Sequence, residues 1–545
     1  MDSGADYGWW GFGSLARVFF VNEQACTILC PIPHALADHP AHQFPLLIIH
    51  RQCPNQGGTV VNAEYSVVAD VLIRDEIIVA VKPNIQLTGG MQVLDATGKL
   101  VMPGGIDPHT HLDMPFMGQV SCDDFASGQR AALAGGTTMH IDFVLPVEHD
   151  LLAGLEAWRK KARHGVMDYG FHMAVTSWSN KVSRDMATVA AQGINSFKFF
   201  MAYKGSFMVE DDALLRGMER CAALGALAQV HAENGAAVAW GQERVAARGV
   251  TAPHGHALSR PAALEDEATG RAIRLAGLAG ARLYVVHVMS GGAADEIAAA
   301  RRHGQRVVGE TVISALALTE DSMWDSNFTV AAAHVMSPPI RSTAHRASVR
   351  QALAGGVLQI VGTDHAVFNS TQKAAGKEDF RAIPNGVNGI EERLHVVWET
   401  MVNSGASTPS DFVRATSTAA ARAFNIYPRK GSVAPGSDAD VIVLDPSVRH
   451  VISAATHHSA VDVNVYEGME VTGKVVLTLS RGRLVWDGTN LNVTAGSGRF
   501  IPMPLFQSSR PDDLGAVVPG TAPTCPSGHR VKHADTQRVA TLTYA

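Results

Sequence analysis

Two histidines in the stretch MPGGIDPHTHLDMPFMG, which covers residues 102–118, have the spacing of a metal-binding pair. Side chains two positions apart on an extended strand point to the same side, so His109 and His111 can present two imidazoles to one ion. The apolar run before them predicts such a strand, and Asp107 adds an acidic side chain two residues ahead of the pair. An isolated pair of this kind is more often structural than chemical, so its interpretation depends on partners downstream.

Four further strand-like runs carry a side chain that can serve as a ligand. The runs are SFKFF, ALAQVH, LYVVH and LQIVGTD, and each combines apolar residues with a ligand-type side chain at or near its end. Any one of them has a structural explanation, such as a histidine that bonds to a backbone group. Five strand ends that all carry such a residue favour a shared site. The candidate ligands are His109, His111, Lys198, His231, His287 and Asp364.

Lys198 is the unusual member of this set, because an ammonium group has only donors and cannot bind a cation. A neutral amine can react with carbon dioxide to form a carbamate, which has carboxylate geometry and can bridge two metals. The neighbouring Phe197, Phe199 and Phe200 make an apolar setting that would lower the pKa of the amine by desolvation. We therefore expect two Zn²⁺ ions bridged by carbamylated Lys198 and a hydroxide, with Asp364 as the residue that takes the proton.

Strand-like and helical stretches alternate through the middle of the chain over roughly 250 to 300 residues, which is typical of a parallel (β/α)8, TIM-like barrel. Functional residues of that fold lie at the C-terminal ends of the strands. Short strands on both sides of this region predict a smaller β-sandwich domain formed from both chain ends. The expected ranges are 1–45 for an N-terminal extension, 46–104 and 432–500 for the sandwich, 105–431 for the barrel and 501–545 for a tail.

Individual elements of the barrel can be placed by residue number. Strands are predicted at 136–144, 171–176, 195–201, 227–231, 282–287, 305–310 and 358–363. Helices are predicted at 154–163, 184–192, 211–224, 261–279, 293–302 and 346–354.

The composition is that of a globular protein with a large core. Of the 545 residues 46% are hydrophobic and 18% charged, and the net charge of −6 indicates no nucleic-acid partner. The six cysteines form no CxxC pair, which favours a reducing compartment. No run of about 18 apolar residues predicts a membrane span, and the N-terminal stretch lacks the basic start of a secretory signal. We expect no membrane partner and a cytoplasmic location.

Longer motifs connect the candidate ligands to a known family. They are GGTTMHIDF, NSFKFFMAYKG, AQVHAENG, YVVHVMS, GTDHAVFNSTQKAAGKEDF and IPNGVNGIEERL. Together with residues 102–118 they resemble the cyclic amidohydrolases, most closely the dihydropyrimidinase (hydantoinase) family, over residues 57–503. The resemblance implies a homotetramer of barrel and sandwich domains with two zinc ions on the six candidate ligands. It also implies that Tyr203 stabilises an oxyanion and that Ser337 and Asn385 hydrogen-bond the substrate's ring amide.

The reaction implied by the resemblance is hydrolysis of a small cyclic amide. The family opens the ring of 5,6-dihydrouracil or dihydrothymine, a step of pyrimidine catabolism, to give 3-ureidopropionate (N-carbamoyl-β-alanine) or its methyl analogue. Dihydroorotase carries an arginine two positions after the second histidine, which pairs with the substrate carboxylate. This chain has Asp113 there, which favours a neutral ring. Specificity for hydantoin or allantoin stays open.

One alternative is that the protein is not an enzyme. The collapsin-response mediator proteins share the fold but have lost ligands, and they act as cytoskeletal binding proteins. All six ligand positions are present in this chain, which favours a cyclic amide hydrolase. The stretch HRQCPNQ, residues 50–56, departs from the family pattern and is expected to form a loop at the edge of the sandwich.

Overall fold

A parallel barrel forms the centre of the computed structural model, which describes residues 47–50 and 58–507. Its eight strands are hydrogen-bonded in the order β17-β16-β15-β14-β13-β12-β11-β8. The strands are β8 (Gly105–Thr110), β11 (Thr137–Val144), β12 (Asp168–Ala174), β13 (Ser196–Phe200), β14 (Leu227–His231), β15 (Arg282–Val285), β16 (Val307–Val312) and β17 (Ile360–Gly362). A parallel bridge joins Thr110 of β8 to His365, three residues after β17, so the two ends of the sheet meet and the predicted barrel is confirmed.

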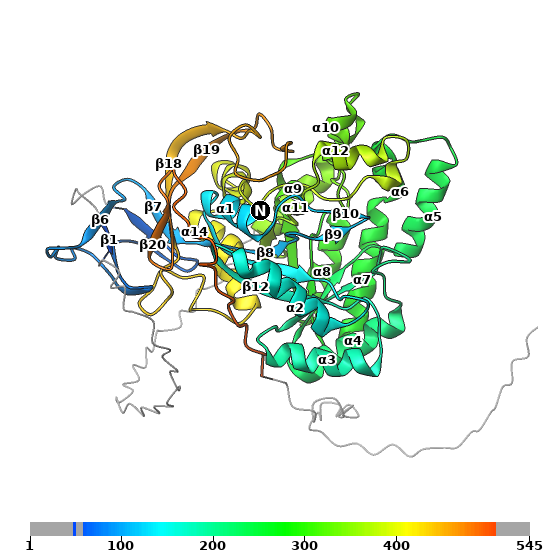
Figure 1. The fold of residues 1–545 in the computed structure, drawn as a ribbon, viewed down its shortest axis with the longest axis horizontal. Helices are drawn as coiled ribbons and strands as arrows, with labels where there is room; N and C mark the ends of the chain where they lie inside the picture. The colour runs from blue at the N-terminus through cyan, green and yellow to red at the C-terminus, as the bar shows by residue number, and fades with distance from the viewer. Residues whose placement is uncertain (1–46, 51–57, 508–545) are drawn as a thin grey trace, which may run out of the picture. The chain divides into compact units, whose positions relative to one another are not determined.

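Helices follow the strands along the chain and cover the barrel from outside (Figure 1). The main ones are α1 (Phe125–Ala134), α2 (Leu151–Lys161), α3 (Asn180–Ala191), α4 (Asp211–Leu224), α7 (Ala262–Leu278), α8 (Gly291–Arg302) and α11 (Thr343–Ala354). Helix α4 illustrates why these segments are helical. Its buried residues Leu214, Met218 and Cys221 recur every three to four positions, and Gly225 ends it in the left-handed conformation.

The barrel strands are buried on both faces, as a parallel sheet covered by helices requires. All eight residues of β11 and all five of β13 are buried. Their side chains therefore divide between the barrel interior and the helix layer. Polar residues that such strands bury, such as Lys198 and His140, must find partners inside the protein.

Two smaller sheets flank the barrel in sequence; the first is built from N-terminal strands alone, and the second combines strands from both ends of the chain. The first has the order β5-β4-β1-β6 and the second β20-β19-β18-β7-β2-β3. Their strands are β1 (Leu47–His50), β2 (Thr59–Val61), β3 (Ser66–Val68), β4 (Asp70–Arg74), β5 (Ile77–Lys82), β6 (Gln92–Asp95), β7 (Leu100–Pro103), β18 (Val441–Val451), β19 (Glu470–Ser480) and β20 (Arg483–Trp486). Strand β18 pairs antiparallel with β7, and Val71, Val101 and Val441 share one apolar core, which confirms the predicted origin of the sandwich.

Several sequence expectations concern segments at the margins of the described chain. The predicted extension 1–45 and residues 51–56 of the unusual stretch lie outside the described residues, as does the tail beyond 507. Within the tail, Ile501 and Met503 are buried, and the backbone N–H of Met503 donates to Gly193. The exact domain boundaries stay a prediction. Among the residues that the structure describes, no helix has the length and apolar character needed to cross a membrane.

Candidate metal centre

The six predicted ligands lie at one end of the barrel, where the strands terminate. His109 belongs to β8 and Lys198 to β13, while His231 is the last residue of β14. The other three follow strand ends directly or by two residues: His111, His287 and Asp364. All six side chains are buried. The loop positions after the strands are strained, since His287 and Asp364 have φ values of +39° and +54°.

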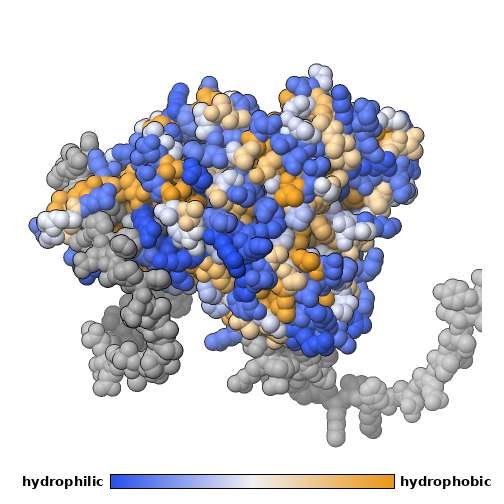
Figure 2. Space-filling model, viewed as in Figure 1, coloured by the Kyte–Doolittle hydropathy of each residue, from blue (hydrophilic) through white to orange (hydrophobic). Residues whose placement is uncertain are grey.

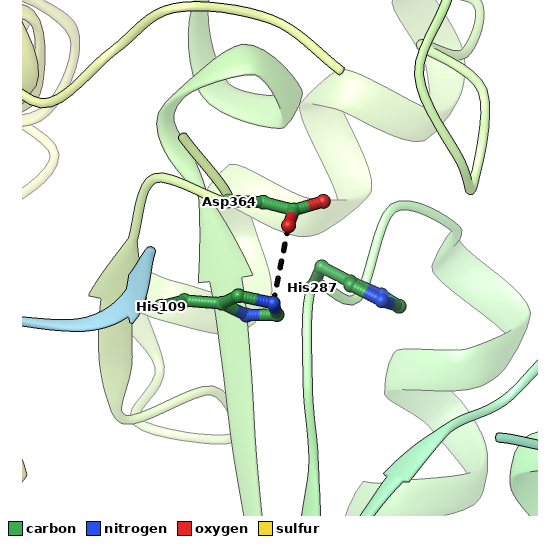
Figure 3. Close-up of side chains that lie close together, drawn as sticks. All are labelled: His109, His287 and Asp364. Atoms are coloured by element: carbon green, nitrogen blue, oxygen red, sulfur yellow. Dashed lines mark ion pairs between the residues drawn. The ribbon is translucent and has the colours of Figure 1, made fainter. Parts of the chain in front are cut away.

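The histidine pair converges on a single carboxylate. The Nε2 atoms of His109 and His111 each lie 3.1 Å from Oδ1 of Asp364. Figure 3 shows the side chains of His109 and Asp364 meeting, with His287 beside them. Burial alone would raise the pKa of Asp364, but the two imidazoles outweigh this effect and hold it well below its usual value. The carboxylate is therefore ionised near neutral pH and available as a ligand or a proton acceptor.

His231, His287 and Lys198 complete the cluster. The ring of His287 lies 4.6 Å from that of His231 and 5.3 Å from that of His109, measured between centroids. Nζ of Lys198 lies 4.5 Å from the ring centroid of Phe143 and 5.2 Å from that of Phe200. Burial lowers the pKa of Lys198 to about 8, so a larger fraction of the amine is neutral near pH 7 than for an exposed lysine.

The aromatic setting of Lys198 differs in part from the one inferred from sequence. Phe197 and Phe199 alternate with Lys198 along β13 and therefore point to the opposite side of the strand. The ring of Phe199 packs so closely on Gly217 of α4 that an added Cβ there would lie 2.2 Å from it. Phe143, from β11, which lies two strands away in the barrel, takes their place over the amine. The expected direction of the pKa change is confirmed, although the side chains that cause it are partly different.

The donor atoms fit a divalent cation. His109, His287 and Asp364 each offer one ligand atom, and these atoms all lie within 4.8 Å of one another. Within the described residues, the buried Nδ1 of His287 has no hydrogen-bond partner, and the buried Nε2 of His109 faces the Asp364 oxygen, which is itself an acceptor. Such nitrogens are costly in a protein interior unless another group satisfies them. A set of imidazole nitrogens and a carboxylate oxygen suits zinc and similar ions. Lys198 joins such a set only after conversion to an anionic group.

Three buried carboxylates lie behind the candidate ligands, and of these only Asp107 was noted from sequence, without a role. Glu310 of β16 accepts a hydrogen bond from Nδ1 of His109 at 2.6 Å and one from the backbone N–H of His287 at 3.0 Å. Glu233 pairs with Nε2 of His231 at 2.8 Å. Asp107 accepts from the hydroxyl of Thr363 at 2.6 Å. An acidic residue inside an otherwise apolar strand end was the available signal, but the sequence did not show which ligand it would contact.

The predicted substrate residues lie beside the ligands. Tyr203, Ser337 and Asn385 line one small cavity together with His111 and Asp364. Nδ2 of Asn385 donates to Oγ of Ser337 at 2.9 Å, and the ring of Tyr203 lies 5.1 Å from that of His231. Burial raises the pKa of Tyr203 to about 12, so its hydroxyl stays protonated and can donate. Tyr203 and Asn385 also line a larger mouth, whose wall includes the hairpin of β9 (Pro115–Phe116) and β10 (Gln119–Val120).

The position of Asp113 differs from the one expected from sequence, which was close enough to the substrate to repel an anion. Its carboxylate is 3.7 Å from Nζ of Lys161, and it is not among the residues that line the cavity. Any repulsion between Asp113 and an anionic substrate would therefore act from outside the cavity. Among the described residues, the lining of the small cavity contains no arginine, whereas the lining of the larger mouth includes Arg260 and Arg381. Asp113 therefore does not itself supply the argument for a neutral ring.

Comparison with known proteins decides the family. Residues 100–485 match the model of the Amidohydrolase family. The chain is 60% identical over 452 residues to the dihydropyrimidinase of Arabidopsis thaliana. The aligned residues cover 83% of this chain and 85% of that protein. The chain belongs to the dihydropyrimidinases of the amidohydrolase family. A rat dihydropyrimidinase is 48% identical over 88% of its length, and the human dihydropyrimidinase-related protein 5 is 43% identical over 81%.

Solved structures of dihydropyrimidinases and hydantoinases share the fold. The crystal structure of dihydropyrimidinase from Brevibacillus agri superposes with a TM-score of 0.82 at 43% identity, covering 85% of this chain and all of that one. D-hydantoinase from Bacillus sp. AR9 gives a TM-score of 0.81 at 44% identity with the same coverage. Both the family and the fold predicted from sequence are confirmed.

Proposed function

We propose that this chain hydrolyses the ring amide of 5,6-dihydrouracil and dihydrothymine, giving 3-ureidopropionate and its methyl analogue in pyrimidine breakdown. The observation that carries the proposal is one buried cavity that combines ligand residues with a proton acceptor, a hydroxyl donor and two polar side chains for an amide ring. The identity of 60% to a plant dihydropyrimidinase supports the choice of substrate. Hydantoin, the ring named in the related structures, is the nearest competing substrate.

The proposed cofactor is a pair of zinc ions. His109, His111, Lys198, His231, His287 and Asp364 would hold them, with Lys198 carbamylated as the bridge. When bound, the ions supply Lewis acidity and lower the pKa of water, so that a nucleophile forms near neutral pH. The low pKa of the Lys198 ammonium supports carbamylation, because only the neutral amine reacts with carbon dioxide.

The protein's own groups would divide the remaining work. Asp364 takes the proton from the attacking water and passes it to the leaving ring nitrogen, since its carboxylate is ionised and lines the cavity. The Tyr203 hydroxyl donates a hydrogen bond to the oxygen that becomes negative during the attack. Ser337 and Asn385 hold the ring amide. Glu310 and Glu233 fix the orientation of the histidines in front of them.

Side-by-side turnover of four substrates tests the proposal. Dihydrouracil, hydantoin, allantoin and dihydroorotate are compared at equal concentration, with metal analysis on the same preparation. We expect dihydrouracil to have the highest kcat/KM and dihydroorotate the lowest, and about two zinc ions per subunit. A metal-replete protein that hydrolyses none of the four rings would refute the proposed reaction. Zinc content near zero together with no turnover would favour a non-enzymatic relative.

We also propose that the protein assembles as a homotetramer. The sandwich exposes apolar side chains on β3, β5 and β6, among them Val68, Val79 and Val93, which are each more than a third exposed. Figure 2 shows orange, hydrophobic surface in the region of these strands. Apolar patches of this kind on soluble proteins commonly mark interaction sites. Light scattering after size-exclusion chromatography should give four times the chain's mass of 57.9 kDa, whereas a monomer mass would contradict the proposal.

A further inference from the structure

A buried lysine lies beneath the substrate cavity and outside the metal cluster. Lys373 ends the short helix α12 (Ser370–Lys373), and only 3% of its surface is exposed. Its Nζ donates to the backbone carbonyl of Val335 at 3.0 Å and to that of Gly386 at 2.8 Å. Val335 stands two residues before Ser337, and Gly386 directly follows Asn385. One amine thus joins the two backbone segments that carry the proposed ring-binding side chains.

The position is a costly one for a lysine. Burial lowers the pKa of Lys373 to about 7, and no carboxylate of the described chain lies within ion-pair distance to offset that desolvation. Buried lysines without a paired charge are rare, because an apolar side chain of similar volume would fill the same space at lower cost. The two hydrogen bonds from the amine to backbone carbonyls are therefore what a lysine provides at this position and a methionine does not.

Other bonds also hold the segments that Lys373 joins, among them one between Nε2 of His256 and the carbonyl of Met336 at 2.8 Å. The N–H of Gly386 donates to the same Val335 carbonyl at 2.9 Å, and Nδ2 of Asn385 reaches Oγ of Ser337 at 2.9 Å. Gly386 has a φ of +146°, and a Cβ there would lie 2.0 Å from the Ala366 carbonyl oxygen. Its backbone therefore cannot move toward Ala366, and on its other side the amine of Lys373 holds it. A shift of either segment would move Ser337 or Asn385 relative to the ligands.

Helix α12 also contacts the hairpin at the mouth of the cavity. Gln372 donates from Nε2 to the carbonyl of Val120 in β10 at 2.8 Å. Its Oε1 accepts from the N–H of Asn369 at 2.9 Å, which closes a capping box at the start of the helix. The four residues of α12 thus contact three parts of the cavity wall, namely β10 and the two segments that carry Ser337 and Asn385. These contacts give the helix a fixed position from which Lys373 can act.

We propose that Lys373 is a positioning residue of the substrate site, which sets the spacing between Ser337 and Asn385 through its two bonds to the backbone. The proposal rests on the proposed function in one respect, namely that these two side chains bind the ring amide. In the described part of the chain, Lys373 is neither a candidate ligand nor one of the residues that line the cavity. Its loss should weaken substrate binding and leave the metals and the chemical step in place.

Steady-state kinetics on the metal-replete protein test this role. Lys373→Met keeps the length of the side chain and removes the donor, and Lys377→Met, at an exposed lysine four residues on, is the matched control. We expect KM for dihydrouracil to rise roughly tenfold in Lys373→Met with kcat within about threefold of the wild type, because a small displacement of a binding group costs affinity first. Zinc content should equal that of the wild type, and the control should match the wild type throughout.

Amide hydrogen exchange gives a second readout that needs no activity. Peptides covering 334–338 and 384–388 should exchange faster in Lys373→Met than in the wild type, while peptides of α4 should not change. Equal exchange and an unchanged KM would overturn the proposal, and so would a parallel loss of zinc and kcat, which indicates general destabilisation. Lys373→Gln replaces Lys373→Met if the latter does not fold. If the wild type hydrolyses no cyclic amide, the proposed function fails, and the exchange result alone decides the role of Lys373.

Discussion

Glu310 shows how a single side chain prepares the site before any metal binds. One of its oxygens accepts hydrogen bonds from the imidazole of His109 and from the backbone N–H of His287. The other accepts one from the hydroxyl of Tyr284 at 2.7 Å. A carboxylate behind a histidine fixes the tautomer, so that the nitrogen on the far side of the ring presents a lone pair. The far nitrogen of His109 faces Asp364. The orientation of two proposed ligands therefore depends on this one glutamate.

Replacing this glutamate should weaken metal binding. Glu310→Gln keeps the shape but removes the charge, and we expect zinc affinity to fall roughly 10- to 100-fold. Competition with a chelator of known affinity measures the change. Glu243→Gln, at an exposed position, is the control and should bind zinc like the wild type. An unchanged affinity in Glu310→Gln would show that the carboxylate does not support His109.

Tyr203 should act on the chemical step and not on the metals. Tyr203→Phe removes only the hydroxyl, and we expect kcat for dihydrouracil to fall roughly 100- to 1000-fold, the usual effect of losing one oxyanion donor. Zinc content should stay at the wild-type value, because the residue is not a proposed ligand. A kcat within a few fold of the wild type would exclude the hydroxyl as the donor.

At the scale of elements, loops after the barrel strands connect the site to the sandwich. Asp123, between β10 and α1, accepts from Nε2 of His365 at 2.9 Å and from the N–H of Ala460 at 2.8 Å. The first partner directly follows Asp364, and the second belongs to the segment between β18 and β19. Burial alone would raise the pKa of Asp123, but His365 and the other donors lower it to about 2.

The low pKa of Asp123 predicts a pH-dependent contribution to stability. Because the folded value of about 2 is below the ordinary 3.8, the contribution is full above pH 4 and is lost as pH falls toward 2. The difference corresponds to about 2 kcal/mol of unfolding free energy. Asp123→Asn should lose about this much at pH 7 in urea unfolding, and the gap to the wild type should close below about pH 2. Glu156→Gln, at an exposed site, should behave like the wild type at both pH values; a constant gap for Asp123→Asn would contradict the assignment.

Local signals in the sequence were sufficient for many elements. The structure places α4 at Asp211–Leu224 and β14 at Leu227–His231, the same residues that the sequence predicted, because the apolar spacing is regular and Gly225 separates the two. The candidate ligands could be proposed for a similar reason, since they stand in or just after apolar runs.

Contacts between distant residues could not be predicted in this way. Glu310 is 201 residues from His109, and nothing in its own strand shows that the two meet. Lys373 reads as an ordinary polar residue in STQK, because burial is set by segments that are far away in the chain. Asp113 was placed by its position relative to His111, but its side chain turns to Lys161 on α2. Single-sequence reasoning thus proposed the candidate ligands and missed the groups that contact them from behind.

At the scale of the whole molecule, one buried ion cluster joins the barrel to the segment that leads into β18. Lys430 lies 2.6 Å from a carboxylate oxygen of Asp168 on β12 and 3.0 Å from one of Asp438, and it also pairs with Asp440. Arg481, after β19, pairs with Asp168 at 3.0 Å. The acidic residues could suggest a second metal site, but three cations balance the three carboxylates, since Arg429 also pairs with Asp438 at 2.9 Å. Their role is to hold barrel and sandwich together.

Removing the central cation should destabilise the protein strongly. Lys430→Met leaves buried carboxylates without their main partner, and we expect a loss of about 3–5 kcal/mol in unfolding free energy. Urea unfolding followed by circular dichroism measures it. Lys160→Met, at an exposed position, should change stability by less than about 0.5 kcal/mol. A similar small change in Lys430→Met would mean that the cluster contributes little.

Zinc titration of the metal-free protein, with dihydrouracil hydrolysis as the readout, tests the central claim most directly. We expect the rate to rise with added Zn²⁺ and to level off at about two ions per subunit, and Lys198→Ala to stay inactive at every loading. Hydrolysis that does not depend on the metal, or full activity in Lys198→Ala, would contradict a two-metal site bridged by this lysine.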